Sequence, residues 1–314
     1  MTPRPLARPA MRWLGMAALA VLVWPDPVRA GAKDTYFERT AMAAADLRCG
    51  LFTPEMRAAL AMATAQARGA ALRDGVPARA LGEGGIRARA LGGRVDCGSS
   101  ELAQTAGDIR HAFDGFTRML RLTYPGDVAS WHADRAPSEE ARWRLAQDVA
   151  AGPDRLRFGL AGREAPGRLM AVASFADGRA PYAARLLVRD LRRSPEPHLA
   201  RMSSGPTRSL PLDRRTPSPS ALSLHGAEAR SRVGRDLLPK DRKTGWAFRF
   251  SPAAAAALAA LDPREAVILE FLFAEGEARR AYVEVGDFAA GQAFVKQAWA
   301  GFGVRSGRGQ PAED

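Results

Sequence analysis

The chain has 314 residues, with 46 Lys and Arg against 34 Asp and Glu, and a formal net charge of +12. A content of 46% hydrophobic and 25% charged residues excludes a disordered chain, because such a composition can bury a core. The 30 Gly and 22 Pro follow no period, which excludes a collagen-like protein, and 2 Cys exclude a disulfide-dense scaffold. The length fits one large domain or two ordinary ones.

The first 30 residues have the pattern of a secretory signal peptide. Arg4, Arg8 and Arg12 lie before or at the start of an uncharged apolar run of 12 residues at 13–24. A Pro-Asp-Pro break follows, and small residues lead to a cleavage site near Ala30. A membrane anchor would need about 20 apolar residues. We therefore expect a Sec-type signal, a periplasmic or secreted mature protein, and no transmembrane segment after signal removal.

The two cysteines, Cys49 and Cys97, are expected to form a disulfide, because export brings them into an oxidising space. The bond would close a loop of about 50 residues and stabilise the fold by about 4 kcal/mol in the chain-entropy treatment. A metal pair or a catalytic thiol is the alternative. The wide spacing of the pair lacks the close ligand spacing of a zinc site.

Residues 31–125 are expected to be a helical region. Helix-forming residues fill 34–48, Thr53 followed by Pro54 is a typical helix start, and a weaker helix at 77–91 contains several glycines. The disulfide would join the first part of this region to its last helix. That last helix carries one apolar stripe with spacings of three and four residues, formed by Leu102, Ala106, Ile109, Phe113, Phe116 and Leu120.

The second half of the chain is expected to be rich in strands. Residues 126–153 would link the halves and hold one short helix at 138–150. An antiparallel β/α domain follows at 154–300, where the apolar period changes from 3.6 to 2, and it contains a basic Pro/Ser-rich connector at 191–243. A flexible tail is expected at 301–314. The predicted class is α+β: an N-terminal disulfide-stapled helical region followed by a mainly antiparallel β-sheet domain with two C-terminal helices.

The order of helix, hairpin, Gly-Asp-Phe and helix over residues 251–299 resembles the C-terminal pattern of the invasion-associated locus B family of exported bacterial proteins. The resemblance rests on apolar pattern over about a sixth of the chain. The cysteine-bearing β region of that family has no counterpart in this sequence. The resemblance therefore implies no function for this chain.

Catalytic motifs are absent from the sequence. There is no G-x-S-x-G nucleophile motif, no phosphate-binding Gly-rich loop and no metal-type histidine spacing, so we expect no cofactor and no metal. This favours a non-enzymatic protein. The alternative is an envelope hydrolase whose site forms only in three dimensions, near His132, Asp134 or His225. A weaker alternative is an apolar-ligand binder that uses Trp246, Phe248 and Phe250.

Positive charge is concentrated in residues 185–243, which hold fourteen Lys or Arg and six Asp or Glu. A clustered basic surface attracts anions through its summed field. For an exported protein these would be an anionic envelope lipid, a polysaccharide or an acidic protein; nucleic acid is not expected, because aromatic residues for base stacking are lacking there. The candidate anion-binding residues are Arg192, Arg193, Arg214 and Arg215. The alternative is a solvated loop that coding bias has enriched in arginine.

Overall fold

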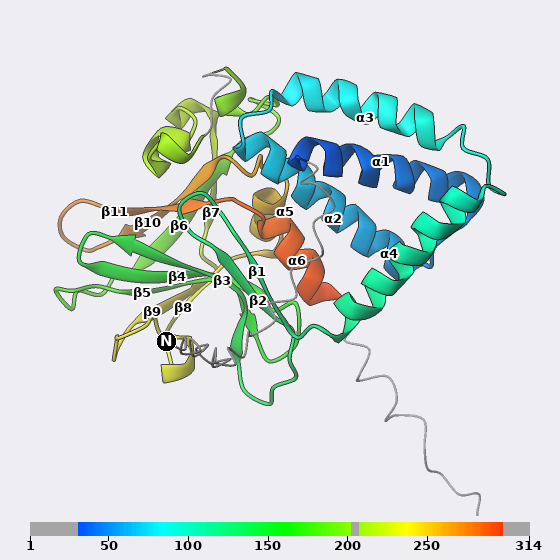
Figure 1. The fold of residues 1–314 in the computed structure, drawn as a ribbon. Coiled ribbons are helices and arrows are strands. Elements are labelled where there is room, and N and C mark those ends of the chain that lie inside the picture. Colours follow the sequence, from blue (N-terminus) through cyan, green and yellow to red (C-terminus); the bar gives the residue numbers. More distant parts are fainter. Residues whose placement is uncertain (1–30, 202–206, 298–314) are drawn as a thin grey trace, which may run out of the picture. The chain divides into compact units, whose positions relative to one another are not determined.

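The computed structural model describes residues 31–201 and 207–297 (Figure 1). The signal peptide predicted at 1–30 and the tail predicted at 301–314 lie outside the described residues. Within the described ranges, no helix is long and apolar enough to cross a membrane. The structure confirms the predicted class: four N-terminal helices precede antiparallel sheets, and two further helices lie near the C-terminal end.

The N-terminal helices form a layer in which α3 packs on α1, α1 on α2, and α2 on the later helix α6. Side-chain caps fix two of the helix starts, because the Thr53 hydroxyl accepts the N–H of Met56 and the Ser99 hydroxyl accepts that of Leu102. This helical layer consists of α1 (Ala32–Cys49), α2 (Pro54–Arg73), α3 (Ala78–Gly92) and α4 (Ser100–Arg118).

Helices α1 and α3 run parallel and lie unusually close. A Cβ atom on Gly85 would lie 2.7 Å from the Tyr36 hydroxyl oxygen, and one on Gly92 would lie 2.1 Å from the carbonyl oxygen of Ala41. Gly85, one of the glycines that weaken the helix pattern in the sequence, and Gly92 are therefore the residues that let α3 approach α1, whereas Gly82 has nothing within 4 Å. The predicted disulfide is confirmed: Cys49 and Cys97 join the C-terminal end of α1 to the loop after α3, with a Cα–Cα distance of 5.6 Å.

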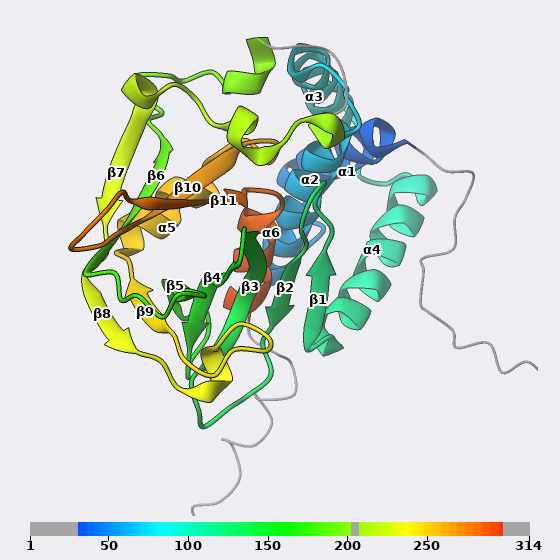
Figure 2. The same cartoon turned by 90° about the vertical axis from the view of Figure 1, so that its left-hand side faces the viewer.

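Two antiparallel sheets face each other and form a sandwich (Figure 2). One has seven strands in the order β1-β2-β3-β4-β5-β9-β8, and the other has four in the order β11-β10-β6-β7. The strands are β1 (Arg121–Tyr124), β2 (Trp131–Asp134), β3 (Arg142–Ala151), β4 (Asp154–Gly162), β5 (Arg168–Ser174), β6 (Ala183–Arg189), β7 (Leu222–Gly226), β8 (Ala229–Arg232), β9 (Trp246–Arg249), β10 (Ala266–Leu272) and β11 (Arg279–Glu284).

The predicted linker is part of the seven-stranded sheet, and the helix expected at 138–150 is wrong. This stretch is β3, in which Leu145 and Val149 face the main core while Ala146 packs in a second apolar cluster on the opposite face. Because both faces are covered, the strand shows no clean alternation of polar and apolar residues. That alternation is the signal that separates a strand from a helix in a sequence.

The basic connector is also more ordered than expected. It contributes β7 to one sheet and β8 to the other, so the chain crosses between the sheets at Ala227 and Glu228. The short 3-10 helices in or beside these strands are η1 (His198–Arg201), η2 (Thr207–Ser209), η3 (Leu212–Arg215), η4 (Pro219–Ala221) and η5 (Arg235–Leu237).

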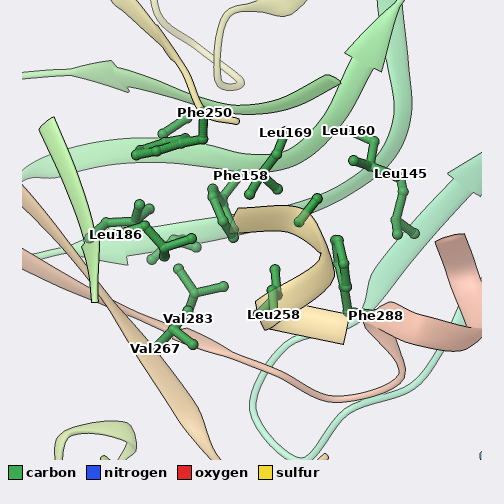
Figure 3. Packing of buried hydrophobic residues seen from close by; sticks show 14 of the residues in the cluster. Leu145, Phe158, Leu160, Leu169, Leu186, Phe250, Leu258, Val267, Val283 and Phe288 are labelled. Atoms are coloured by element: carbon green, nitrogen blue, oxygen red, sulfur yellow. The ribbon is translucent and has the colours of Figure 1, made fainter. Parts of the chain in front are cut away.

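The main core lies between the two sheets and is closed by α5 (Pro252–Ala259) and α6 (Phe288–Lys296). Figure 3 shows Phe158 and Phe250 from the seven-stranded side and Val283 and Val267 from the other sheet on opposite sides of this core, with Leu258 of α5 nearby. Aromatic rings add edge-to-face contacts, including Trp131 against Phe288 at 5.1 Å between ring centroids.

A buried ion pair fastens the helical layer to the sandwich. Arg73, at the end of α2, binds the Asp287 carboxylate through two bonds of 2.9 and 3.1 Å. Burial raises the pKa of Asp287, and the Arg73 guanidinium opposes that rise. The Tyr124 ring of β1 adds an apolar contact in the core, with its hydroxyl 3.8 Å from the sulfur of Met62 in α2. The boundary between the helical region and the sheets therefore combines a buried ion pair with apolar packing.

Candidate functional site

The four arginines predicted to bind anions occupy two different environments. Arg192, Arg193 and Arg214 are exposed, whereas Arg215 is fully buried. Only three of the four side chains are therefore open to solvent.

Arg215 serves the interior of the fold. It lies at the end of η3, against the outer face of the four-stranded sheet, and its Nη1 atom is 3.0 Å from Asp127 and 3.6 Å from Glu284. Its remaining donors reach the carbonyl oxygens of Leu210 and Thr207. An external anion does not reach this guanidinium, so the anion-binding hypothesis does not extend to Arg215.

The carboxylate that Arg215 neutralises organises a loop. Glu284 of β11 accepts the backbone N–H groups of Asp127, Val128 and Ala129 at 2.8 to 3.0 Å. Gln147 of β3 also pairs with the Glu284 backbone. The loop between β1 and β2, the end of β11 and the connector thus meet at one buried, well-satisfied polar cluster.

The exposed arginines of the same stretch differ in their pairing. Arg193 lies 3.4 Å from Asp190, and the backbone N–H groups of Arg192 and Arg193 donate to that carboxylate. These bonds, that of Arg192 first, hold the pKa of Asp190 below its usual value. The side chains of Arg192 and Arg214 have no acidic partner among residues 31–201 and 207–297. They remain available to an external anion.

A second group of cations lies on the edge strand β8. These residues were not among the candidates named from the sequence. In the antiparallel register Arg232 faces Trp246, and Arg230 faces Phe248. The guanidinium carbons of Arg230 and Arg232 lie 3.6 and 4.2 Å from the centroid of the Trp246 ring. Both arginines are exposed, and neither has an acidic partner in the described part of the chain. An Arg-x-Arg strand paired with a Trp-x-Phe strand is the sequence signal that could have revealed this arrangement.

The loop after β8 carries further cations on the opposite face of the seven-stranded sheet. Leu238 is buried with Ala247 in the second apolar cluster, whereas Trp246 packs against the main core, and the Trp143 indole N–H donates to the carbonyl oxygen of Leu237 at 3.0 Å. These contacts anchor the loop while Arg235, Lys240 and Lys243 stay exposed. We call the exposed pair of Arg230 and Arg232 stacked on Trp246 the basic surface. Three exposed acids lie in the same stretch, namely Glu228, Asp236 and Asp241.

The two histidines of the hydrolase hypothesis lie in different sheets. His132 lies exposed on β2, with its Nδ1 atom 3.2 Å from the Thr123 hydroxyl. Asp134, two positions along the same strand, is held by Arg121 and Arg142 at 3.0 and 3.2 Å. His225 lies on β7, in the other sheet, where burial lowers its pKa. Neither His132 nor His225 is hydrogen-bonded to a carboxylate of the described residues.

Two hollows that the described residues line contain no histidine. The first, of about 310 Å³, opens between the sheets beside Phe175, Phe271 and Arg279. Its Arg279 is already paired with Asp154 at 3.2 Å and with Asp177. The second, of about 300 Å³, lies between α1 and α3. Among the residues that the structure describes, no group of His, Cys, Asp or Glu could hold a metal ion.

The apolar-ligand hypothesis also fails on position. Phe248 and Phe250 are buried in the main core, and Trp246 lies beneath the two arginines.

Comparison with protein-family models, with curated proteins and with solved structures finds no match for this chain. The fold and the basic surface together define a disulfide-bonded α+β protein with an exposed, arginine-rich sheet edge.

Proposed function

We propose that this chain is an exported, non-enzymatic binding protein whose basic surface contacts an anionic component of the cell envelope. The signal-peptide pattern that ends near Ala30 would direct it to the periplasm or the exterior. The Cys49–Cys97 disulfide supports this location, because such bonds persist in oxidising compartments. The partner would be a lipid head group, an acidic polysaccharide or an acidic protein.

The stacking of Arg230 and Arg232 on Trp246 is the observation that carries the proposal. A cation–π contact at an exposed site stabilises by about 0.5–1 kcal/mol and holds the guanidinium in place without neutralising it. The N–H donors at the edge of each guanidinium stay free to bind a phosphate or a carboxylate. Two arginines held in this way lose less side-chain entropy on binding than two free ones would.

The proposal is tested by charge reversal with a control of equal charge. The variant Arg230→Glu/Arg232→Glu should bind lipopolysaccharide and isolated cell envelopes at least about 10-fold more weakly, because like charges then face the ligand. The control Arg118→Glu/Lys296→Glu makes the same change in net charge at two exposed helix ends and should bind like the unmodified protein.

A third variant separates preorganisation from charge. Trp246→Leu keeps every cation but removes the ring, and it should weaken binding several-fold. Binding should also fall as the salt concentration rises from about 50 to about 500 mM, since exposed charges are screened over this range. Affinity that is indifferent to salt and unchanged in the Arg230→Glu/Arg232→Glu variant would falsify the proposal.

A further inference from the structure

The edge strand β7 differs from the other three edge strands that the described residues form. Of those three, β1 carries Arg121, β8 carries Arg230 and β11 carries Arg279. Charged side chains on an edge discourage pairing with a further strand. The five residues of β7, Leu222–Gly226, include no Lys, Arg, Asp, Glu or Pro. This edge of the four-stranded sheet therefore lacks the protection that the other edges have.

The hydrogen-bonding pattern shows which backbone groups β7 offers at its open side. The N–H of Ala227 donates to the carbonyl oxygen of Ala184 at 2.9 Å. Because bonded pairs alternate along an antiparallel ladder, residues 225 and 223 also face β6. The intervening residues direct their N–H and C=O groups away from the sheet, and they are Leu222, Leu224 and Gly226. Figure 2 shows β7 at the left-hand margin, and no described strand lies beyond it.

The side chain of Leu224 continues an apolar row on the outer face of the four-stranded sheet. The register places Ile268 opposite Leu187, and Leu187 opposite Leu224. Exposure rises along this row, because Ile268 is 8% exposed, Leu187 is half-buried and Leu224 is 54% exposed. The row therefore ends at the open edge, where one further apolar side chain would cover Leu224.

We propose that β7 pairs in antiparallel orientation with β7 of a second copy of this chain. The two four-stranded sheets would then form one continuous sheet. A two-fold axis at Leu224 places this residue opposite its own counterpart and Leu222 opposite Gly226 of the partner subunit. The three N–H and three C=O groups that each strand directs outward form six backbone hydrogen bonds in this register. The apolar row then runs on through the two Leu224 side chains.

A second copy fits this edge better than an extended segment of another protein does. Residues 222–226 carry no charge that would attract an acidic or a basic segment, and no like charges meet when the strand pairs with itself. The second copy also supplies a leucine opposite Leu224 in the register that uses every outward group. Five residue pairs form a small contact compared with the roughly 1,200 Å² of a stable interface, so the dimer is reversible.

Sedimentation velocity over roughly 1 to 300 µM protein tests the pairing, since small contacts dissociate within this range. The unmodified protein should shift from monomer to dimer. Leu224→Lys brings two like charges together at the two-fold axis and should weaken the dimer at least about 10-fold. Leu224→Pro removes one outward N–H from each strand but no bond to β6, and it should weaken the dimer about 10-fold. The control Ile86→Lys makes the same charge change on α3, at a side chain that is 63% exposed, and should dimerise like the unmodified protein.

Cysteine cross-linking tests the register. The native Cys49 and Cys97 are joined to each other, so an added cysteine is free to react. Two Cα atoms opposite each other in a bonded antiparallel pair lie about 5.5 Å apart, which a disulfide can span. Leu224→Cys should therefore give a covalent dimer under mild oxidation. Leu222→Cys is the control, because it lies opposite Gly226 of the partner subunit and should cross-link more slowly.

Three outcomes would overturn the inference. One is a protein that stays monomeric over the whole concentration range, including one whose β7 pairs with a segment of another protein instead. The others are a Leu224→Lys dimer as stable as the unmodified dimer, and cross-linking of Leu222→Cys at least as fast as that of Leu224→Cys. Arg230→Glu/Arg232→Glu should keep the Leu224→Cys cross-link, because residues 222–226 contain no part of the basic surface. Failure of the proposed function therefore leaves this inference intact.

Discussion

The helical layer and the sandwich are stabilised in different ways. The sandwich has one large core rich in aromatic residues, supported by buried ion pairs such as Arg189–Glu265. The helical layer has only small apolar clusters, for example around Phe52 and Leu60. It relies instead on close contact between small residues and on the disulfide. The helical layer, with its small apolar clusters, thus needs a covalent bond, whereas the sandwich, with its large core, does not.

The largest effect is expected at the polar cluster of the sandwich. Arg215→Met should destabilise the protein by about 3–5 kcal/mol, because it removes the buried guanidinium that contacts Asp127 and Glu284. Urea unfolding measures the change. Arg214→Met, at the adjacent exposed position, should change stability by less than about 0.5 kcal/mol. Equal, small losses in both variants would show that the sandwich does not depend on this cluster.

The disulfide is the corresponding test of the helical layer. Replacing both cysteines, Cys49→Ala/Cys97→Ala, should cost about 4 kcal/mol if loop entropy dominates. Hydrogen exchange should show that α3 loses protection before β10 does, because the bond ties only the helical layer. Uniform loss of protection across both regions would show that the disulfide does not act on the helical layer alone.

Glycine substitutions in α3 test the close helix contact. Gly92→Leu should destabilise by about 1–3 kcal/mol, because the added side chain would collide with the backbone of α1 at Ala41. Gly82→Ala is the control: nothing lies within 4 Å of its Cβ position, and alanine should stabilise the helix by about 0.5–1 kcal/mol. Thermal unfolding distinguishes the two signs. A stabilising Gly92→Leu would mean that α1 and α3 are not in tight contact.

The smallest effect is expected on the pH dependence of stability, and it concerns His225 on the edge strand β7. Burial lowers the pKa of His225 below the ordinary value of 6.5, so the unfolded chain takes up a proton first as pH falls. The stabilising contribution of the neutral imidazole is present above pH 6.5 and is lost as pH falls through the lowered pKa. His225→Gln should therefore lose less stability than the unmodified protein between about pH 7.5 and pH 5.5. Identical pH profiles in urea unfolding would show that His225 does not contribute to the pH dependence of stability.

Local signals in the sequence were sufficient for much of the fold. Thr53 caps α2, as its position before Pro54 suggested, and Ser251 caps α5 in the same way. The hairpin expected within residues 251–299 is β10 and β11, and it turns at Gly276 with a φ of +85°. The helix at 138–150 failed because β3 is covered on both faces. Strands β1, β7 and β8 were missed because each is only four or five residues long and polar.

The candidate site shows more clearly which features could not be predicted from the sequence. Arg214 and Arg215 are neighbours in a basic stretch, yet one is exposed and the other is buried. The difference depends on Asp127, which lies 88 positions away, and on Glu284. No local pattern encodes such a pairing. The stacking of Arg230 on Trp246 likewise depends on the register between β8 and β9, which only the sheet defines.

The bond between Arg73 and Asp287 has a consequence for the order of events during folding. The two residues are 214 positions apart, and a chain is synthesised from its N-terminal end. Arg73 is therefore made long before the carboxylate that neutralises it. The helical layer can close its own contacts in the meantime, but it completes its contact with the sandwich only when nearly the whole chain is present. A chain cut short before Gly286 would leave Arg73 without the Asp287 carboxylate.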